Sequence, residues 1–394
     1  MTLVSGEATT TTARDRFERF ARTEVAPYAA DIDLSGAVPD TVLTRLVDEE
    51  LWGAVVHREA GGTGTGMIDF AVLHEEIGRA CSSVRSLLTV HSMALFALAR
   101  WGSPAARERL FDPMVRGDLR GAFCLTEPGA GSDVSLLETA AKPADGGGFT
   151  LHGTKQWITG GQSAHVLLVF ARTERGITAF LVDVDRPGIE RTPTEGVMGT
   201  RGSMLAEIRF DGCPVGPDDV IGAEGMGAAV IAGVLDIGRL SVAAGSVGIT
   251  QACLDAAVEH AAARFQGGKV LAEHQLVQQM ITRMSVGAQA GRLLCQEAAR
   301  LKDAGSPRTL AATCVAKYHA SVTAMQAASD AVQVLGARGF AVDAAVGRYF
   351  RDAKVMEVIE GSTQIQESLI AQDARLNRGA VVPGDEEREV RDRT

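Results

Sequence analysis

The spacing of hydrophobic residues is the strongest constraint on the fold, because it changes twice along the chain. Residues 14–117 follow helical periodicity, which returns from about residue 225, where Leu276, Met280 and Met284 share one face of a predicted helix. Residues 121–222 contain short apolar runs broken by Gly, Pro and Asp, a pattern typical of strands. The order predicts an α+β protein with an N-terminal α-helical domain, a middle antiparallel β domain and a C-terminal helical bundle.

The length of 394 residues also favours several packed domains, since single cores of this size are unusual. We place the N-terminal α-helical domain at residues 1–119, the middle β domain at 120–225 and the C-terminal α-helical domain at 226–376. Residues 377–394 are highly charged, and we predict that they form a flexible tail.

Charge and composition restrict the possible partners and the cellular location of the protein. A net charge of −10 argues against nucleic acid or an anionic membrane surface as a partner. The N-terminus lacks the basic start and apolar run of a signal peptide. The longest uncharged stretches, 86–99 and 240–254, are short for a bilayer and indicate buried helices. Six scattered cysteines without a CxxC pair favour buried thiols in a reducing cytoplasm. We therefore predict a cytoplasmic protein.

Common catalytic patterns are absent from the sequence. It contains no HExxH, no GxSxG and no P-loop, and its eight histidines show no metal-ligand spacing, so no metal site is predicted. The triplet His74-Glu75-Glu76 is interpreted as part of a helix surface. The glycines of "EAGGTGTGM", residues 59–67, lack GxGxxG spacing and favour an interhelical loop.

Four stretches, in order and at matching spacing, resemble the acyl-CoA dehydrogenase family. They are "AFCLTEPGAGSD" at 122–133, "GTKQWITGG" at 153–161, "MGTRGS" at 198–203 and "IEGSTQIQ" at 359–366. The resemblance covers about residues 15–375. It implies the acyl-CoA dehydrogenase fold, FAD as cofactor, an acyl-CoA or acyl carrier protein (ACP) thioester as substrate, and a homotetramer built as a dimer of dimers.

The resemblance also implies roles for individual side chains at the flavin. Trp157 would pack against the isoalloxazine ring, and Thr126 and Thr159 would hydrogen-bond near N5 and O4. Taken alone, Trp157 would be interpreted as a core aromatic, but its occurrence with the other motifs favours the flavin role. The full implied cofactor-binding set is Phe123, Leu125, Thr126, Gly131, Ser132, Trp157, Thr159, Arg264, His274, Gln275, Gln333, Gly336, Ser362 and Gln364. The implied substrate contacts are Ser132, Asp236, Arg239 and Gly361.

Some of these residues have simpler interpretations that remain open. In the family, FAD lies at a subunit interface, so Arg264 would reach a neighbour's pyrophosphate; otherwise it is a solvated cation at a helix end. His274 and Gln275 are also compatible with a helix cap, and Arg239 with a surface ion pair.

Glu360 has two interpretations from the residues alone. The following Thr363 and Gln366 suit a helix cap, which would leave Glu360 a solvated loop acid. By resemblance it occupies the position of the catalytic base, which removes the α-proton while flavin N5 takes the β-hydride. Its backbone N–H and the flavin ribityl chain would then stabilise the enolate. Some family members place the base at the position of Gly238, which cannot serve here.

Three departures from the family pattern stand out, at Ile359, Gly267 and Ala337, where Tyr, Phe and Gly are common. The stretch "CSSVRSLLTVHSMA" at 81–94 is similar to a polyketide-pathway branch that oxidises small acyl groups on ACP, which implies a small hydroxylated or amino acyl-ACP of extender-unit biosynthesis as an alternative substrate. Three classes of protein remain open. The first is a dehydrogenase that passes electrons to an electron-transfer flavoprotein, and the second is an oxidase that passes them to O₂. The third is a binding protein without activity, which is disfavoured because the base and flavin motifs occur together.

Overall fold

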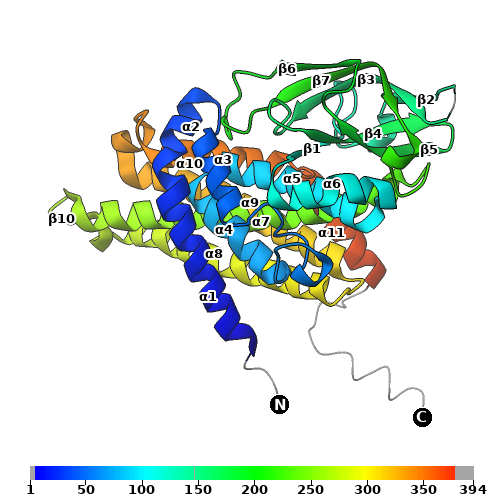
Figure 1. Cartoon of the computed structure of the whole chain (residues 1–394). Coiled ribbons are helices and arrows are strands. Elements are labelled where there is room, and N and C mark those ends of the chain that lie inside the picture. Colours follow the sequence, from blue (N-terminus) through cyan, green and yellow to red (C-terminus); the bar gives the residue numbers. More distant parts are fainter. Residues whose placement is uncertain (1–4, 146, 378–394) are drawn as a thin grey trace, which may run out of the picture.

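The computed structural model describes residues 5–145 and 147–377, with side chains at 13–145 and 147–376. Most of the predicted tail, at 378–394, lies outside the described residues. Figure 1 shows a body of packed helices with a separate β domain lying over one end of it. The α+β class and the order of helical, β and helical regions are confirmed.

The N-terminal region is helical and contains α1 to α6. The last of these, α6, begins after Ser103, whose hydroxyl accepts a hydrogen bond from the Ala106 N–H at 3.0 Å, and it ends at Gly117 in the left-handed conformation. These helices span Ser5–Phe20, Ala29–Ser35, Asp40–Asp48, Met67–Ala80, Ser82–Trp101 and Pro104–Arg116.

The middle region is an 8-stranded sheet in the order β6-β7-β3-β2-β4-β5-β8, with β1 beside β4. Its strands span Gly121–Cys124, Ala140–Pro143, Phe149–Ile158, Val166–Thr173, Gly176–Asp183, Ile189–Pro193, Ala206–Val215 and Val220–Ile221. Most pairs are antiparallel as predicted, but β1 and β2 each pair with β4 in parallel. The sheet is therefore mixed. The chain between β1 and β4 provides the long connection that a parallel pair requires.

The C-terminal region is a bundle of long helices around α7. It contains α7 to α11 and a small hairpin, β9–β10, which follows α7. The helices span Gly227–Ala263, Gln275–Asp303, Thr309–Leu335, Ala345–Val358 and Thr363–Asn377, and the two strands span Phe265–Gln266 and Lys269–Val270.

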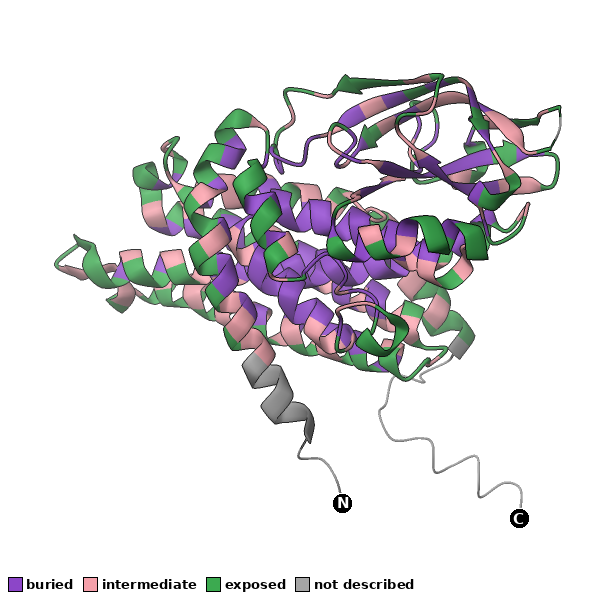
Figure 2. Ribbon diagram, in the orientation of Figure 1, coloured by how far each residue is buried: buried purple, intermediate pink, exposed green. Residues whose placement is uncertain are grey.

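Helix α7 is the centre of the molecule. It packs against α4, α5, α8 and α9, and these contacting faces form the buried interior seen in Figure 2. Helices α5 and α7 are longer than the uncharged stretches suggested, and by length and composition either could cross a membrane. However, 89% and 67% of their most apolar windows are buried inside the protein, as in core helices of globular proteins. All six cysteines are buried and unpaired, as predicted.

Candidate active site

Glu360 lies in the short connection between α10 and α11. Its backbone φ is +55°, and that of the following Gly361 is +88°. A left-handed conformation is uncommon for a residue with a long side chain and persists only where the surroundings enforce it. The connection therefore holds Glu360 in one particular orientation.

Three side chains from other helices fix the backbone of this connection. Lys317 of α9 donates from Nζ to the Gly361 carbonyl oxygen at 2.8 Å. Gln366 of α11 donates from Nε2 to the carbonyl oxygens of Glu360, at 3.2 Å, and Gly361, at 3.0 Å. Arg239 of α7 donates from Nε to the Glu360 carbonyl oxygen at 3.4 Å. All of these bonds go to main-chain oxygens, so none of them neutralises the carboxylate.

The carboxylate of Glu360 packs against Gly238 of α7. A Cβ atom at Gly238 would overlap Glu360 Oε2 and would lie 3.0 Å from Met93 Sδ of α5. The glycine is therefore needed for this packing. Glu360 Oε2 is buried and has no hydrogen-bond partner among the described residues. An acceptor that is buried without a partner usually has a functional reason.

This environment changes the acidity of Glu360. Burial raises the pKa of its carboxyl from 4.5 to about 7, and the nearby charges of Arg239, Arg85 and Lys317 only partly oppose this effect. Burial also lowers the pKa of Lys317 to about 8. A carboxylate with a pKa near neutrality is well suited to accept a proton.

A second group of predicted residues surrounds the junction of β1 and β3. The Gln156 N–H donates to the Thr126 carbonyl oxygen at 2.8 Å, which brings Thr126 beside Trp157. Trp157 has φ +59° and its side chain is 53% exposed, so it is not a core aromatic. Thr159 and Phe123 are half-buried.

A buried ion pair, which the sequence analysis did not identify, joins the same two segments. Lys155 of β3 is fully buried and donates from Nζ to Glu127 Oε1 at 2.7 Å and to the Leu125 carbonyl oxygen at 3.1 Å. Glu127 also accepts from the N–H groups of Glu138, at 2.6 Å, and Thr139, at 3.0 Å. The pair fixes the loop after β1 against β3. Both residues lie inside the recognised motifs, and that position is the only sequence signal for them.

These segments fit a flavin. A flat ring system needs an exposed aromatic or apolar face, and Trp157 presents one at an enforced backbone angle. A Cβ atom at Gly129 or at Gly131 would meet nothing within 4 Å, so the loop leaves open space beside its main chain. Ser132 is exposed next to that space. The residues present could therefore hold FAD.

Helix α5 connects the surroundings of Glu360 to the β1 segment. His91 Nδ1 accepts from the Gly121 N–H at the start of β1, at 3.1 Å. Met93, two residues further along, belongs to the packing around Gly238 and Glu360. Leu125, just after β1, is part of the same hydrophobic core as Met93. The structure thus brings Glu360 and the β1 segment to one region of the molecule.

Other predicted residues lie elsewhere in the single chain. Arg264 and Gln275 are exposed near the β9–β10 hairpin, where His274 contacts the Gln266 carbonyl oxygen at 2.9 Å. Gln333 and Gly336 are exposed at the end of α9. Figure 1 shows this hairpin and the β domain at opposite ends of the molecule. One chain therefore does not bring these residues to Trp157.

The remaining predicted residues lie around α7 and α11. Asp236 is buried and forms an ion pair with Lys302 of α8, so it is already partnered. Arg239 is buried in α7 and forms no ion pair with a described carboxylate, so the surface ion-pair interpretation is wrong. Ser362 is half-buried, and Gln364 is exposed at the start of α11.

The prediction for His74-Glu75-Glu76 is wrong, because all three side chains are buried in α4. Glu75 accepts hydrogen bonds from Arg14 at 2.9 Å and Arg292 at 2.7 Å, while His74 Nδ1 lies 2.9 Å from Ser241 Oγ. Across the described ranges, no group of three or more His, Cys, Asp or Glu could hold a metal ion.

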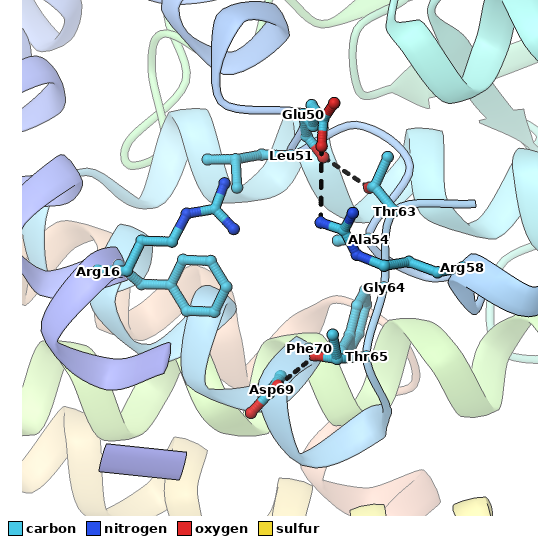
Figure 3. Close-up of a pocket in the computed structure, with 11 residues that line it drawn as sticks. Arg16, Glu50, Leu51, Ala54, Arg58, Thr63, Gly64, Thr65, Asp69 and Phe70 are labelled. Carbon is cyan, nitrogen blue, oxygen red and sulfur yellow. Dashed lines mark hydrogen bonds and ion pairs between the residues drawn. The ribbon is translucent and has the colours of Figure 1, made fainter. Parts of the chain in front are cut away.

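A small pocket between α1 and the loop before α4 lies apart from these residues (Figure 3). Its volume is about 40 Å³, which suits one or a few water molecules and not a substrate. The carboxylate of Glu50 lies 3.6 Å from Arg58 across it. We assign it no function.

Comparison with known proteins identifies similar chains. Residues 7–118, 122–213 and 225–374 match the N-terminal, middle and C-terminal domains of acyl-CoA dehydrogenase. The human short-chain specific acyl-CoA dehydrogenase of mitochondria is 35% identical over 89% of this chain and 86% of its own.

Solved structures are similar over nearly the whole chain. A glutaryl-CoA dehydrogenase from Mycobacterium smegmatis in complex with FADH2 has a TM-score of 0.89 at 25% identity, covering 95% of this chain and 96% of its own. FkbI, described as acting in biosynthesis of the methoxymalonyl extender unit of a polyketide immunosuppressant, has a TM-score of 0.84 at 32% identity, covering 91% and 99%.

Proposed function

The chain belongs to the acyl-CoA dehydrogenase family, and we propose that Glu360 removes the α-proton of its acyl thioester substrate. Members of this family are oxidoreductases that act on CH–CH groups of acyl-CoA. One observation carries the proposal: the Glu360 carboxylate is buried on Gly238, lacks a partner at Oε2, and has a pKa raised to about 7 by burial.

The proposed base needs this environment because the α-proton of a thioester is only weakly acidic. A solvated carboxylate with a pKa near 4.5 would be too weak a base, whereas one near 7 is ionised in part and holds a proton well. Lys317 and Gln366 bond to the carbonyl oxygens around Glu360, and so they orient the side chain without pairing with it. The charge of Arg239 favours the ionised form between turnovers.

Main-chain groups support the second part of the proposed mechanism. The N–H of Glu360 donates to no atom of the described residues, so it remains available to the thioester oxygen. A donor at that oxygen stabilises the negative charge that develops as the α-proton leaves.

We further propose that FAD is the cofactor and that the loop after β1 and the Trp157 region of β3 hold it. When bound, FAD supplies the two-electron acceptor for the hydrogen that leaves the β carbon. The exposed Trp157 ring and the open space at Gly131 support this assignment. Purified protein should be yellow and release FAD on denaturation. A colourless protein that takes up no FAD would exclude the cofactor.

The adenosine end of the cofactor points to an assembly of several copies. Arg264, Gln333 and Gly336 are exposed and far from Trp157 in one chain, which favours their contribution to a site in a neighbouring copy. We propose that this assembly is a homotetramer, and the groove of about 540 Å³ between α8 and α9, where Val286 and Val322 are exposed, offers an apolar face for contact between copies. We expect Arg264→Ala to lose FAD while keeping its fold, because the pyrophosphate loses its cation. A variant that binds FAD as tightly as the parent would contradict this role.

The carrier and the electron acceptor are narrower proposals. The similarity to FkbI supports an ACP-bound acyl group, with a hydroxyl or amino substituent, as an alternative to acyl-CoA. An electron-transfer flavoprotein suits a dehydrogenase, and O₂ would suit an oxidase. The test is mass spectrometry of products after short acyl groups are offered on CoA and on ACP, with and without O₂. A 2-Da loss from the acyl group is expected, and no change with any thioester would contradict dehydrogenation.

A further inference from the structure

The motif "MGTRGS" lies in a tightly constrained segment, residues 198–204, that has no role in the reaction as proposed above. We call these residues the MGTRGS segment. Thr200 and Met204 have left-handed backbones, with φ of +47° and +48°, and both are buried. Neither residue is a glycine, and such conformations persist only where the surroundings enforce them. The contacts that enforce them show what the segment holds in place.

The first half of the MGTRGS segment is fixed to helix α10. The buried carboxylate of Asp352 accepts a hydrogen bond from the Thr200 N–H at 2.6 Å. A Cβ atom at Gly199 would overlap the Arg351 carbonyl oxygen, so the two backbones are in direct contact. Helix α10 leads directly into the connection that carries Glu360.

The second half of the MGTRGS segment is fixed to the end of β3. The Gly160 N–H donates to the Ser203 carbonyl oxygen at 2.9 Å. The chain then enters β7, where Ala206 is paired with Ile158 of β3. Trp157 is the residue before Ile158. The segment therefore joins α10, which leads to the proposed base, to the strand that carries Trp157.

This link matters because the proposed reaction removes hydrogens from two adjacent carbons. Glu360 belongs to the helical bundle and Trp157 to the β domain, so contacts between these two regions set their separation. A displacement of about 1 Å between reacting groups can slow a reaction on the order of 10²-fold. A buried acceptor that fixes one backbone to the other limits such displacement.

We propose that Asp352 is a positioning residue for dehydrogenation, because it holds the MGTRGS segment on α10 and so fixes the Glu360 carboxylate relative to Trp157. The inference rests on the proposed function. Asp352 itself contacts neither the thioester nor the flavin in this role. Its loss leaves the base and the flavin-binding residues in place but changes their separation. Removal of the α-proton and departure of the β-hydrogen should then become uncoupled.

The first test measures the two events separately. Butanoyl thioesters of CoA and of ACP report the complete reaction, followed as anaerobic flavin reduction by stopped-flow absorbance. (Methylthio)acetyl thioesters carry sulfur in place of the β carbon and have no β-hydrogen to lose. With them, Glu360 removes the α-proton and returns a deuteron from D₂O to the same carbon, with no change in oxidation state. Mass spectrometry of this deuterium uptake therefore reports α-proton removal alone.

The variants are Asp352→Ala, which removes the acceptor, and Asp352→Asn, which keeps one for the Thr200 N–H. In Asp352→Ala, flavin reduction should slow on the order of 10²-fold while deuterium uptake changes by less than about threefold. Asp352→Asn should restore the parental ratio of the two rates. FAD content should be parental in both variants.

A second readout does not depend on activity. Amide hydrogen exchange of residues 198–204 should become at least about tenfold faster in Asp352→Ala and stay parental in Asp352→Asn. Asp219→Ala is the matched control, because Asp219 is also buried and accepts a backbone N–H, that of Gly216 at 2.7 Å, but lies within the β domain. It should change neither the ratio of the two rates nor the exchange of residues 198–204.

Gly199→Ala gives a second disruption that leaves the carboxylate unchanged, and it decides the question if Asp352→Ala does not fold. The added Cβ would push the MGTRGS segment away from α10, so the same uncoupling is expected. Equal losses of reduction and deuterium uptake, or parental rates of both, would overturn the positioning role in an enzyme whose parent is active. If the parent itself neither reduces its flavin nor exchanges the α-proton with any of these thioesters, the proposed function fails.

Discussion

Two glutamates with buried carboxylate oxygens, Glu75 of α4 and Glu360 after α10, differ in how their charge is satisfied. Glu75 accepts hydrogen bonds from two arginines, Arg14 and Arg292. Burial would raise its pKa, but these bonds and charges outweigh it and hold the pKa below the usual value. Glu360 also has cations nearby, yet Lys317 bonds to a neighbouring carbonyl oxygen instead of the carboxylate. Burial therefore dominates and raises its pKa to about 7.

The comparison shows that burial alone does not make a carboxylate a base. With two arginine partners, Glu75 is a fixed anion that joins α1, α4 and α8. Without a direct partner, Glu360 can gain and lose a proton near neutrality. The same residue type thus contributes to stability at one site and is suited to proton transfer at the other.

The largest expected effect is at the unpaired glutamate. Glu360→Gln keeps the shape but cannot accept a proton, so anaerobic flavin reduction by an active thioester should slow by roughly 10²- to 10⁴-fold. FAD content should stay at the parental level. Glu357→Gln, three residues earlier and paired with Lys354, is the control and should reduce at the parental rate. Parental rates in Glu360→Gln would mean that Glu360 is only part of a helix cap.

Substitution of the paired glutamate, Glu75, should lower stability instead of the rate of flavin reduction. Glu75→Gln removes the carboxylate that pairs with Arg292 and one of the two that pair with Arg14, the other being Glu76, and it should lower the free energy of unfolding by about 3–5 kcal/mol, measured by urea denaturation. Flavin reduction per folded enzyme should be unchanged. Because the pKa of Glu75 is lowered on folding, its contribution is present above pH 4.5 and is lost as the pH falls through the folded value. The variant should therefore lose less stability on acidification than the parent. A strong loss of flavin reduction in Glu75→Gln would contradict the claim that Glu75 contributes to stability and not to proton transfer.

A smaller effect is expected at the glycine that supports Glu360. Gly238→Ala adds a Cβ where Oε2 now lies, so the carboxylate must move and flavin reduction should slow roughly tenfold. Gly347→Ala in α10 is the control, because its nearest contact would be an ordinary 3.5 Å. Alanine normally favours a helix over glycine, so a loss specific to Gly238→Ala would report the displaced carboxylate. An unchanged rate of flavin reduction would indicate that the rate does not depend on the exact position of the Glu360 carboxylate.

The fold was predictable because its signals are local. Alternating and helical spacings separate the β domain from the two helical regions, but they could not show that β1 pairs with β4 in parallel, since pairing depends on distant segments. The candidate site was found through motif resemblance at Glu360 and Trp157. Their left-handed backbones were not visible in the sequence, because neither residue is a glycine.

The residues missed by the sequence analysis are buried charges. Lys155 and Arg85 resemble surface residues in sequence, because lysine and arginine are seldom buried without a partner. The prediction that His74-Glu75-Glu76 lies on a helix surface was wrong for the same reason. Helix α4 is covered on nearly all sides, and its carboxylates pair with arginines from α1 and α8. Only the three-dimensional packing shows which charges are paired.

The most direct test of the account is the pH dependence of flavin reduction in the unmodified enzyme. At saturating thioester and without O₂, the limiting rate constant should rise with pH as Glu360 loses its proton, with a midpoint near 7 and the slope of a single ionisation. The same titration should be absent from the residual rate of Glu360→Gln. A midpoint near 4.5, the ordinary value for a solvated glutamate, or a flat profile between pH 6 and 8, would contradict the claim that burial without a partner makes Glu360 the base.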